Sequence, residues 1–146
     1  MLDRTYTGYM TTASAAGILR QLILDEARWR SSEDVGRALD PQAPDPKAVA
    51  AQARREERIF AAWDGTRFRY PAFQFGADGR PRAQTAMLTR VLPRDESNAV
   101  GTDACLWVFQ PDGALDDRSP AELFPEYPER VIELARRRRD GSDLDD

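Results

Sequence analysis

The chain has 146 residues, of which 41% are hydrophobic and 32% charged, so it can build one cooperative core and wholesale disorder is excluded. It contains no histidine and one cysteine, Cys105. These counts exclude an internal disulfide, zinc sites that need histidine or several cysteines, and nucleophilic mechanisms that need histidine. No apolar run approaches the roughly 18 residues that span a bilayer, and the first ten residues do not look like a signal peptide. We expect a cytoplasmic protein without a metal or other cofactor.

The net charge of −4 conceals an uneven distribution along the chain. Residues 28–94 carry thirteen Lys and Arg against eight Asp and Glu, whereas residues 95–146 carry six against fourteen. A basic middle and an acidic end indicate two surfaces with different partners, one of which can be nucleic acid. Solvated charge without any partner is the alternative.

Three helices are predicted in the first third of the chain. Apolar residues recur at helical spacing from Thr12 to Ala27. Acidic residues after Ser31 predict a second, short helix, and Asp45 followed by Pro46 predicts a third. The second and third helices outline a helix-turn-helix, although their turn is longer than the three or four residues typical of that motif.

A β-hairpin is predicted directly after the third helix. Asp64-Gly65 lies between two aromatic-rich runs and favours a type I′ turn, which needs positive φ at both central residues. A hairpin that follows a basic helix is similar to the wing of a winged helix. The candidate DNA-binding residues of helix and hairpin are Lys47, Arg54, Arg55, Arg58, Arg67 and Arg69. Their alternative interpretation is a solvated basic face.

The second half of the chain is predicted to be helical. A fourth helix runs through residues 83–91, and the polar loop at 94–98 has the composition of a boundary. We place an N-terminal region at residues 1–75 and a C-terminal domain at residues 76–146. Ser119 and Tyr127, each followed by proline, predict two more helix starts. The second of these helices has an apolar stripe made of Val131, Ile132, Leu134 and Ala135.

A composite pattern runs through this C-terminal domain. It consists of Trp107, Leu115-Asp116, the run Arg118-Ser119-Pro120-Ala121-Glu122-Leu123-Phe124, Pro128 to Val131, and the upstream block at residues 70–75. The pattern resembles the toxin-binding domain of the Xre/MbcA/ParS antitoxin family, in which a tryptophan helix precedes a Leu-Asp-Gly-x-(Ser/Thr)-Pro turn. This chain has Asp117 where the family usually has glycine. If that position needs a positive φ, aspartate is among the better substitutes.

The resemblance implies an antitoxin of a type II toxin–antitoxin system. Such a protein binds and occludes the active site of a cognate toxin, often a RES-type enzyme that consumes NAD, and can repress its own operon as a homodimer on operator DNA. The implied toxin-binding residues are Leu115, Asp116, Arg118, Ser119, Pro120, Glu122, Leu123, Phe124 and Val131. Internal packing of the hairpin is the alternative for the apolar members. The acidic tail after Arg139 is either a solvated end or a segment that enters a basic cleft of the partner.

Two other classes of function stay open. The first is a DNA-binding transcriptional regulator whose C-terminal half only dimerises. The second is an enzyme with a carboxylate cluster at Asp112, Asp116 and Asp117, but an aspartate-rich turn explains these residues adequately and we expect no catalysis. The fold that we expect is mainly α with a small β-hairpin: a helix-turn-helix-like N-terminal half followed by a helical toxin-binding domain. It should hold six or seven short helices and a sheet of two or three strands.

Overall fold

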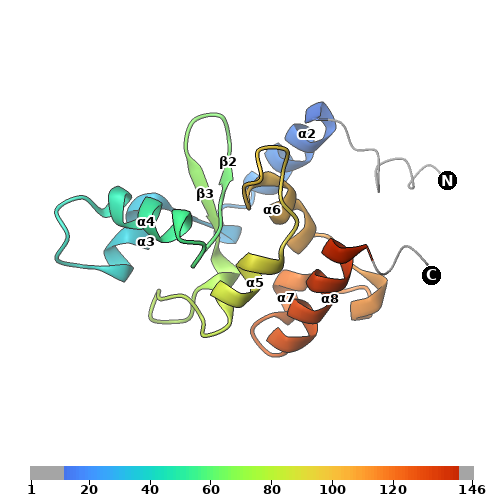
Figure 1. Cartoon of the computed structure of the whole chain (residues 1–146). Coiled ribbons are helices and arrows are strands. Elements are labelled where there is room, and N and C mark those ends of the chain that lie inside the picture. Colours follow the sequence, from blue (N-terminus) through green and yellow to red (C-terminus); the bar gives the residue numbers. More distant parts are fainter. Residues whose placement is uncertain (1–11, 142–146) are drawn as a thin grey trace.

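The computed structural model describes residues 12–141, and Figure 1 shows how their elements are arranged. The α-helices are α2 (Thr12–Ile23), α3 (Ser32–Leu39), α4 (Pro46–Arg55), α5 (Thr85–Val91), α6 (Thr102–Val108), α7 (Pro120–Leu123) and α8 (Pro128–Asp140). The strands are β1 (Trp29–Ser31), β2 (Ala62–Trp63) and β3 (Phe68–Pro71), and the 3-10 turns are η1 (Glu26–Arg28), η2 (Ala72–Gln74) and η3 (Gly113–Leu115). This part of the chain is therefore mainly helical with a small antiparallel sheet of three strands, and the predicted class is confirmed.

Side-chain caps set the starts of α3 and α4. The Ser31 hydroxyl accepts a hydrogen bond from the Asp34 N–H at 3.1 Å, and the Asp45 carboxylate accepts one from Ala48 at 3.3 Å. Both predicted starts are confirmed, because each cap satisfies a backbone donor that has no partner within the helix. The sequence predicts that the third helix continues to Arg58, but α4 ends at Arg55 and the backbone turns at Glu57 with a φ of 59°.

Close backbone packing joins α3 to α4. A Cβ atom on Gly36 would lie 1.8 Å from the carbonyl oxygen of Pro46, so only glycine permits this approach. The pair shares a small buried cluster with the sheet, made of Val35, Ala50, Ala53, Ile59, Ala61, Tyr70 and Phe75. Six residues, 40–45, separate the two helices, as the prolines of the sequence indicated.

The sheet has the order β1-β3-β2, with β3 in the middle. Trp29 lies opposite Pro71 in the first pairing, and Trp63 lies opposite Phe68 in the second. The sequence did not predict β1, because three residues are too few to show a period of two and their partner strand is nearly forty residues away.

The hairpin between β2 and β3 is confirmed, but its predicted type I′ turn is wrong. Of the two residues at the predicted turn centre, only Gly65 has a positive φ, of 103°. The Asp64 carboxylate instead accepts hydrogen bonds from the N–H groups of Thr66 at 2.7 Å and Arg67 at 2.9 Å. These bonds stabilise a four-residue loop at 64–67, so β3 begins only at Phe68.

The main hydrophobic cluster draws on both sides of the boundary that the sequence suggested at residue 75. Leu19, Trp29 and Phe60 from the first part share it with the helices that follow. Those helices contribute Leu88, Val91, Leu92, Ala104, Cys105, Leu106, Val108, Leu115, Leu123, Phe124, Val131, Ile132, Leu134 and Ala135. α2 packs on α6, and α5 packs on α8. The C-terminal helices thus complete their core with residues from the N-terminal part.

Gln74 connects these parts through hydrogen bonds and is fully buried. Its side chain accepts from the N–H of Phe60 at 3.0 Å and donates to the carbonyl of the same residue at 2.8 Å. Its own carbonyl accepts from the Thr85 hydroxyl at 2.8 Å, at the start of α5. The segment before β2, the turn η2 and helix α5 therefore meet at one residue, through its side chain and its backbone carbonyl.

No helix in the stretch 12–141 is long and apolar enough to cross a membrane.

We predict that Gln74→Leu lowers the free energy of unfolding by about 2–5 kcal/mol, because it leaves a buried N–H and a buried C=O of Phe60 without partners. Urea denaturation followed by circular dichroism measures this loss. Thr89→Val is the matched control: it also removes a buried polar group, but the Thr89 hydroxyl bonds within its own helix, to the Thr85 carbonyl. We expect a loss below about 1 kcal/mol for the control. Equal losses for the two variants would show that Gln74 has no special role.

Candidate partner-binding surfaces

The loop at residues 112–118 is closed by a dense set of local contacts. The Asp112 carboxylate accepts from the Ala114 N–H at 2.9 Å, and the Asp112 N–H donates to the Arg118 carbonyl at 3.1 Å. Arg138 of α8 donates to the same carboxylate at 2.8 Å, and Arg130 of α8 donates to the Ala114 carbonyl at 3.4 Å. Arg130 and Arg138, both in α8, thus attach the loop to this helix at two points, Ala114 and Asp112.

The turn inside this loop has an unusual backbone. Asp116 and Asp117 are consecutive residues with positive φ, of 58° and 64°. The sequence considered a positive φ at Asp117 as one possibility, and the structure has it; the positive φ of Asp116 was not considered. This conformation is one that aspartate tolerates better than most residues.

The turn leads into the cap of α7. The Ser119 hydroxyl accepts from the Glu122 N–H at 3.2 Å, while the Glu122 carboxylate accepts from the Ser119 N–H at 3.0 Å. Pro120 occupies the first turn of α7, and Pro128 occupies the first turn of α8. Both predicted helix starts are confirmed.

The apolar residues of the implied toxin-binding set lie inside the chain's own core. Leu115, Leu123, Phe124 and Val131 are each at most 2% exposed, so internal packing, which the sequence left as the alternative, is what the structure shows. Ser119 and Pro120 are also buried. The exposed members of the set are Asp116, Arg118 and Glu122. In this conformation, a partner would touch those three and their exposed neighbours.

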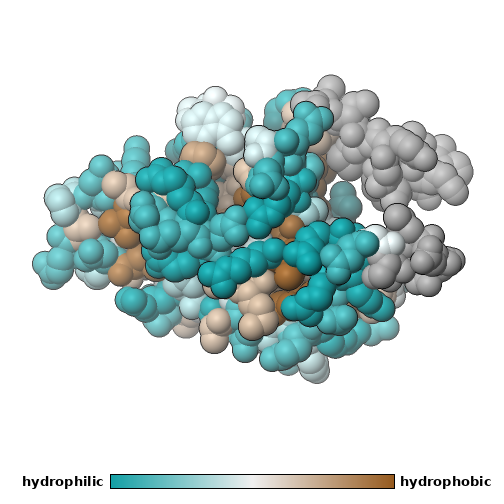
Figure 2. Space-filling view, in the orientation of Figure 1, coloured by the Kyte–Doolittle hydropathy of each residue, from teal (hydrophilic) through white to brown (hydrophobic). Residues whose placement is uncertain are grey.

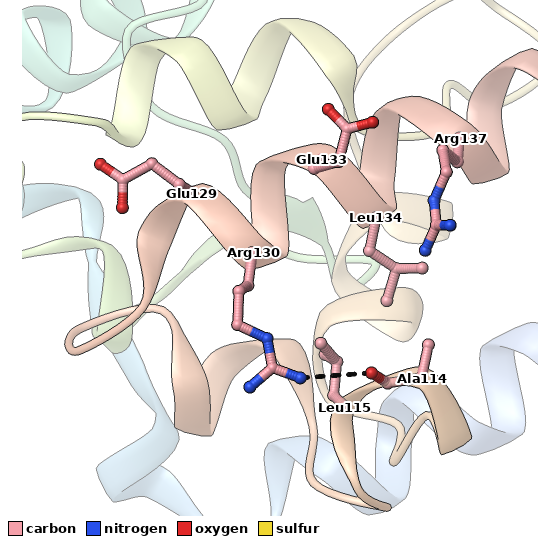
Figure 3. Close-up of a pocket in the computed structure, with 7 residues that line it drawn as sticks. All are labelled: Ala114, Leu115, Glu129, Arg130, Glu133, Leu134 and Arg137. Carbon is pink, nitrogen blue, oxygen red and sulfur yellow. Dashed lines mark hydrogen bonds between the residues drawn. The ribbon is translucent and has the colours of Figure 1, made fainter.

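A groove separates the loop from α8, and Figure 3 shows the residues that line it. Its volume is about 400 Å³. Leu115 and Leu134 lie between the two walls, with Arg130 reaching from α8 toward the Ala114 carbonyl. Glu129, Glu133 and Arg137 complete the wall on α8. Of these residues, the sequence indicated Leu115 as a binding residue, Leu134 as part of the apolar stripe, and Glu129 and Arg130 as part of the pattern. Ala114, Glu133 and Arg137 were not among the candidates.

Exposed acidic side chains outnumber exposed basic ones in this region. Between residues 112 and 141, seven acidic residues are exposed against five basic ones. They are Asp116, Asp117, Glu122, Glu126, Glu129, Glu133 and Asp140 against Arg118, Arg130, Arg137, Arg138 and Arg139. In the view of Figure 2, the molecule is mostly hydrophilic and its apolar residues form small, separate patches. A partner for this region would therefore be recognised largely by charge.

The six cations predicted to bind DNA divide into two groups. Lys47, Arg55 and Arg67 are exposed, and Arg54 is partly buried. Arg58 forms an ion pair with Glu56 at 2.9 Å, and Arg69 forms one with Asp64 at 2.7 Å. The last two are thus engaged within the chain, a distinction that the sequence could not make.

The ion pair between Asp64 and Arg69 is the more enclosed of the two, with side chains 10% and 19% exposed. Burial alone would raise the pKa of Asp64, but hydrogen bonds from Arg69 and from the Arg67 and Thr66 N–H groups outweigh it and lower this pKa. At neutral pH the carboxylate is ionised and neutralises Arg69, which therefore contributes little to the charge of the surface.

Trp63 was missed as a candidate by the sequence reasoning. It is 50% exposed at the end of β2, and its ring centroid lies 5.0 Å from that of Phe68 across the hairpin. The guanidinium of Arg54 lies 3.7 Å from the centroid of the Phe68 ring. The signal available in the sequence was a tryptophan directly before the Asp64-Gly65 turn, with Arg67 following it.

The carboxylates considered for catalysis do not form a compact cluster in the structure. Asp112 is paired with Arg138, and Asp116 lies 4.0 Å from Arg130. In the described range, no group of three or more Cys, Asp or Glu side chains is placed to hold a metal ion. Burial raises the pKa of the Cys105 thiol far above its usual value, so this side chain acts as a small apolar residue.

We predict that Asp117→Gly leaves the free energy of unfolding unchanged or raises it by about 0.5–1 kcal/mol, because glycine adopts positive φ without a steric penalty. Asp117→Val should lower it by about 1–2 kcal/mol, since a β-branched residue is strained there. Chemical denaturation of both variants checks the pair. A valine variant as stable as the parent would show that this turn relaxes into another conformation.

Comparison of the chain with protein-family models, with curated proteins and with solved structures found no match. The likeness to the antitoxin family accordingly stays an expectation that derives from the residues of the C-terminal pattern.

Proposed function

We propose that this protein is an antitoxin that binds a cognate toxin enzyme and occludes its active site. The binding region is the C-terminal surface, by which we mean the exposed side chains of Ala114, Asp116, Arg118, Glu122, Glu129 and Arg130. The observation that carries the proposal is the loop at residues 112–118. Local bonds and two arginines of α8 hold it, and it projects side chains of the family-like pattern into solvent.

A loop held in this way suits recognition of a protein partner. Its backbone is already ordered by hydrogen bonds, so less conformational entropy is lost when a partner binds. The buried Leu115, Leu123 and Phe124 then act as the support of the loop. An apolar side chain of the partner can enter the groove beside Leu134.

The charge of the region favours one class of toxin. An enzyme that consumes NAD must bind a pyrophosphate, so its active site is expected to be basic. The excess of exposed carboxylates around the C-terminal surface is complementary to such a site and would speed association. This supports a RES-type toxin as the partner. The residues of the acidic tail beyond Gly141 lie outside the described part of the chain.

The size of a stable interface sets a further requirement. Stable complexes bury about 1,600 Å² in total, which is more than the groove alone can supply. The contact would therefore extend from the groove over the loop and α7. No catalytic step is assigned to the antitoxin itself, because inhibition needs only occlusion.

Deleting residues 112–146 would be a poor test of this proposal. Leu115, Leu123, Phe124 and Val131 belong to the main core, so their removal would unfold the protein as well as removing the surface. Substitutions of exposed residues avoid this problem.

We predict that Ala114→Trp and Glu129→Arg each weaken binding of the protein encoded by the adjacent reading frame by at least about tenfold. The tryptophan fills the groove, and the arginine reverses a charge that is complementary to a basic site; changes at the centre of an interface have effects of this order. Isothermal titration calorimetry measures the affinity, and growth during co-expression measures neutralisation. Glu96→Arg is the charge-reversal control, because Glu96 is an exposed residue outside the C-terminal surface. Unchanged affinity in both test variants, with native circular dichroism, would exclude this surface.

A second candidate function is repression of transcription by a homodimer on operator DNA. It is favoured by α4, where Lys47 and Arg55 are exposed close to the hairpin that carries Arg67. A helix packed against a preceding helix and followed by a hairpin is the arrangement of a winged helix, in which helix and wing contact one duplex. In this alternative the C-terminal half only dimerises.

For operator binding, we predict that Lys47→Gln and Arg55→Gln each weaken a mobility shift on the upstream region of the protein's own gene. Each should also reduce the slope of log K against log salt by about 0.9, as expected for one lost phosphate contact. Arg80→Gln should change neither quantity. Absence of a shift at low salt would remove the regulatory function and leave the antitoxin proposal intact.

A further inference from the structure

A hollow of about 360 Å³ lies where α3, α4 and the β2–β3 hairpin meet. Figure 1 shows the hairpin between α3 and α4 on one side and α6 on the other. The hollow has aromatic walls from Trp63, Phe68 and Tyr70, and three cations reach it from different elements. The cations are Lys47 and Arg54 of α4 and Arg67 of the hairpin loop. Aromatic and basic side chains are thus gathered around one concave site.

Contacts with Arg54 and between two rings fix the aromatic side chains of the first hollow. The Arg54 guanidinium lies 3.7 Å from the Phe68 ring centroid, and Arg54 Nε donates to the Tyr70 hydroxyl at 3.5 Å. Trp63 makes an edge contact with Phe68 at an interplanar angle of 64° and remains half exposed. The indole therefore keeps accessible surface on which a planar group can stack.

A second hollow, of about 270 Å³, adjoins the first. It shares Arg54, Trp63 and Phe68 with the first and adds Arg55. The indole of Trp63 thus contributes to both hollows. A ligand long enough to pass over this ring can occupy both, whereas a single small molecule fills only one.

The charges around the two hollows favour an anionic ligand. Neither Lys47 nor Arg67 forms an ion pair within residues 12–141, whereas Glu33 is the one acidic residue that lines the first hollow. In the second hollow, the Glu57 carboxylate is neutralised by Arg94, which donates to it at 2.7 and 3.1 Å and lowers its pKa. Asp95 in the same hollow accepts hydrogen bonds from Ser97 and from Ala99.

We propose that the paired hollows bind single-stranded nucleic acid, with unpaired bases stacked on Trp63 and phosphates held by Lys47, Arg55 and Arg67. A basic concave surface with an exposed aromatic ring, on which a base can stack, is a combination that binds single strands. A base inside a duplex cannot present its face to Trp63, because both of its faces are stacked on neighbouring bases. This inference does not depend on the antitoxin proposal, and it differs from operator reading by α4 in requiring an unpaired base.

The test uses the full chain and a fluorescently labelled twelve-residue oligodeoxythymidylate at low salt, with fluorescence anisotropy and tryptophan quenching as readouts. We expect binding that quenches tryptophan emission, and a loss of about tenfold in affinity for Trp63→Leu. Trp63→Phe should retain most of the affinity, because it keeps an aromatic face. Arg67→Gln should reduce the salt slope by about 0.7, as for one phosphate of a single strand, while Arg80→Gln should leave it unchanged.

Three further probes separate the possible outcomes. A mixed-sequence duplex of the same length and free thymidine monophosphate should both bind more weakly than the oligonucleotide. Tighter binding of the duplex with no effect of Trp63→Leu would overturn the proposal in favour of duplex recognition. Equal affinity for the monophosphate and the oligonucleotide would show that a single hollow is the site and would overturn binding across both. Absence of tryptophan quenching at millimolar oligonucleotide concentration would overturn the proposal that bases stack on Trp63. Trp63→Leu should not affect binding of the toxin candidate. A failure of the single-strand proposal can therefore be distinguished from a failure of the antitoxin proposal.

Discussion

The fold depends on the hydrogen bonds of one buried amide, that of Gln74. The chain leaves α4 and enters the core at Phe60, where its backbone N–H and C=O can no longer bond to water. The carboxamide of Gln74 satisfies both groups, and the carbonyl of Gln74 anchors α5 through Thr85. In a dry core, leaving such groups unpaired would cost several kcal/mol. This junction connects the segment before β2 to η2 and α5, beside the apolar contacts of the main core.

That junction makes the two halves of the molecule interdependent. Residues such as Leu19 and Phe60 close the core over which α5 to α8 assemble, and these helices in turn hold the loop at 112–118. The apolar residues of the antitoxin-like pattern, among them Leu115 and Phe124, support this loop from within. What remains for a partner is a charged surface with one apolar groove, so the proposed recognition relies on electrostatic complementarity and on a loop that is ordered before binding.

The basic half of the molecule shows how pairing within the chain selects among residues of the same type. Arg69 lies on β3, but the Asp64 carboxylate neutralises it. Arg67, two positions earlier in the hairpin loop, faces solvent. The same carboxylate orders the hairpin loop through backbone N–H groups, so Asp64 has both a structural and an electrostatic effect. Lys47, Arg55 and Arg67 thus remain as exposed cations beside Trp63, on a different set of elements from the C-terminal surface.

The sequence by itself determined the features that depend on neighbouring residues. The caps at Ser31, Asp45 and Ser119, the prolines in the first turns of three helices, the hairpin at Gly65 and the buried stripe of α8 could all be predicted, because their chemistry acts over three or four positions. Tertiary structure alone decided the rest. It added β1, which has meaning only beside β3, and it buried Leu115, Leu123, Phe124 and Val131. It also paired Arg58 and Arg69 with carboxylates and left Trp63 exposed. The C-terminal surface and the two hollows beside Trp63 exist only in the folded chain. Burial and ion pairing depend on contacts between segments that are distant in the chain, and spacing along the sequence does not specify those contacts. These contacts decide which residues remain on the surface.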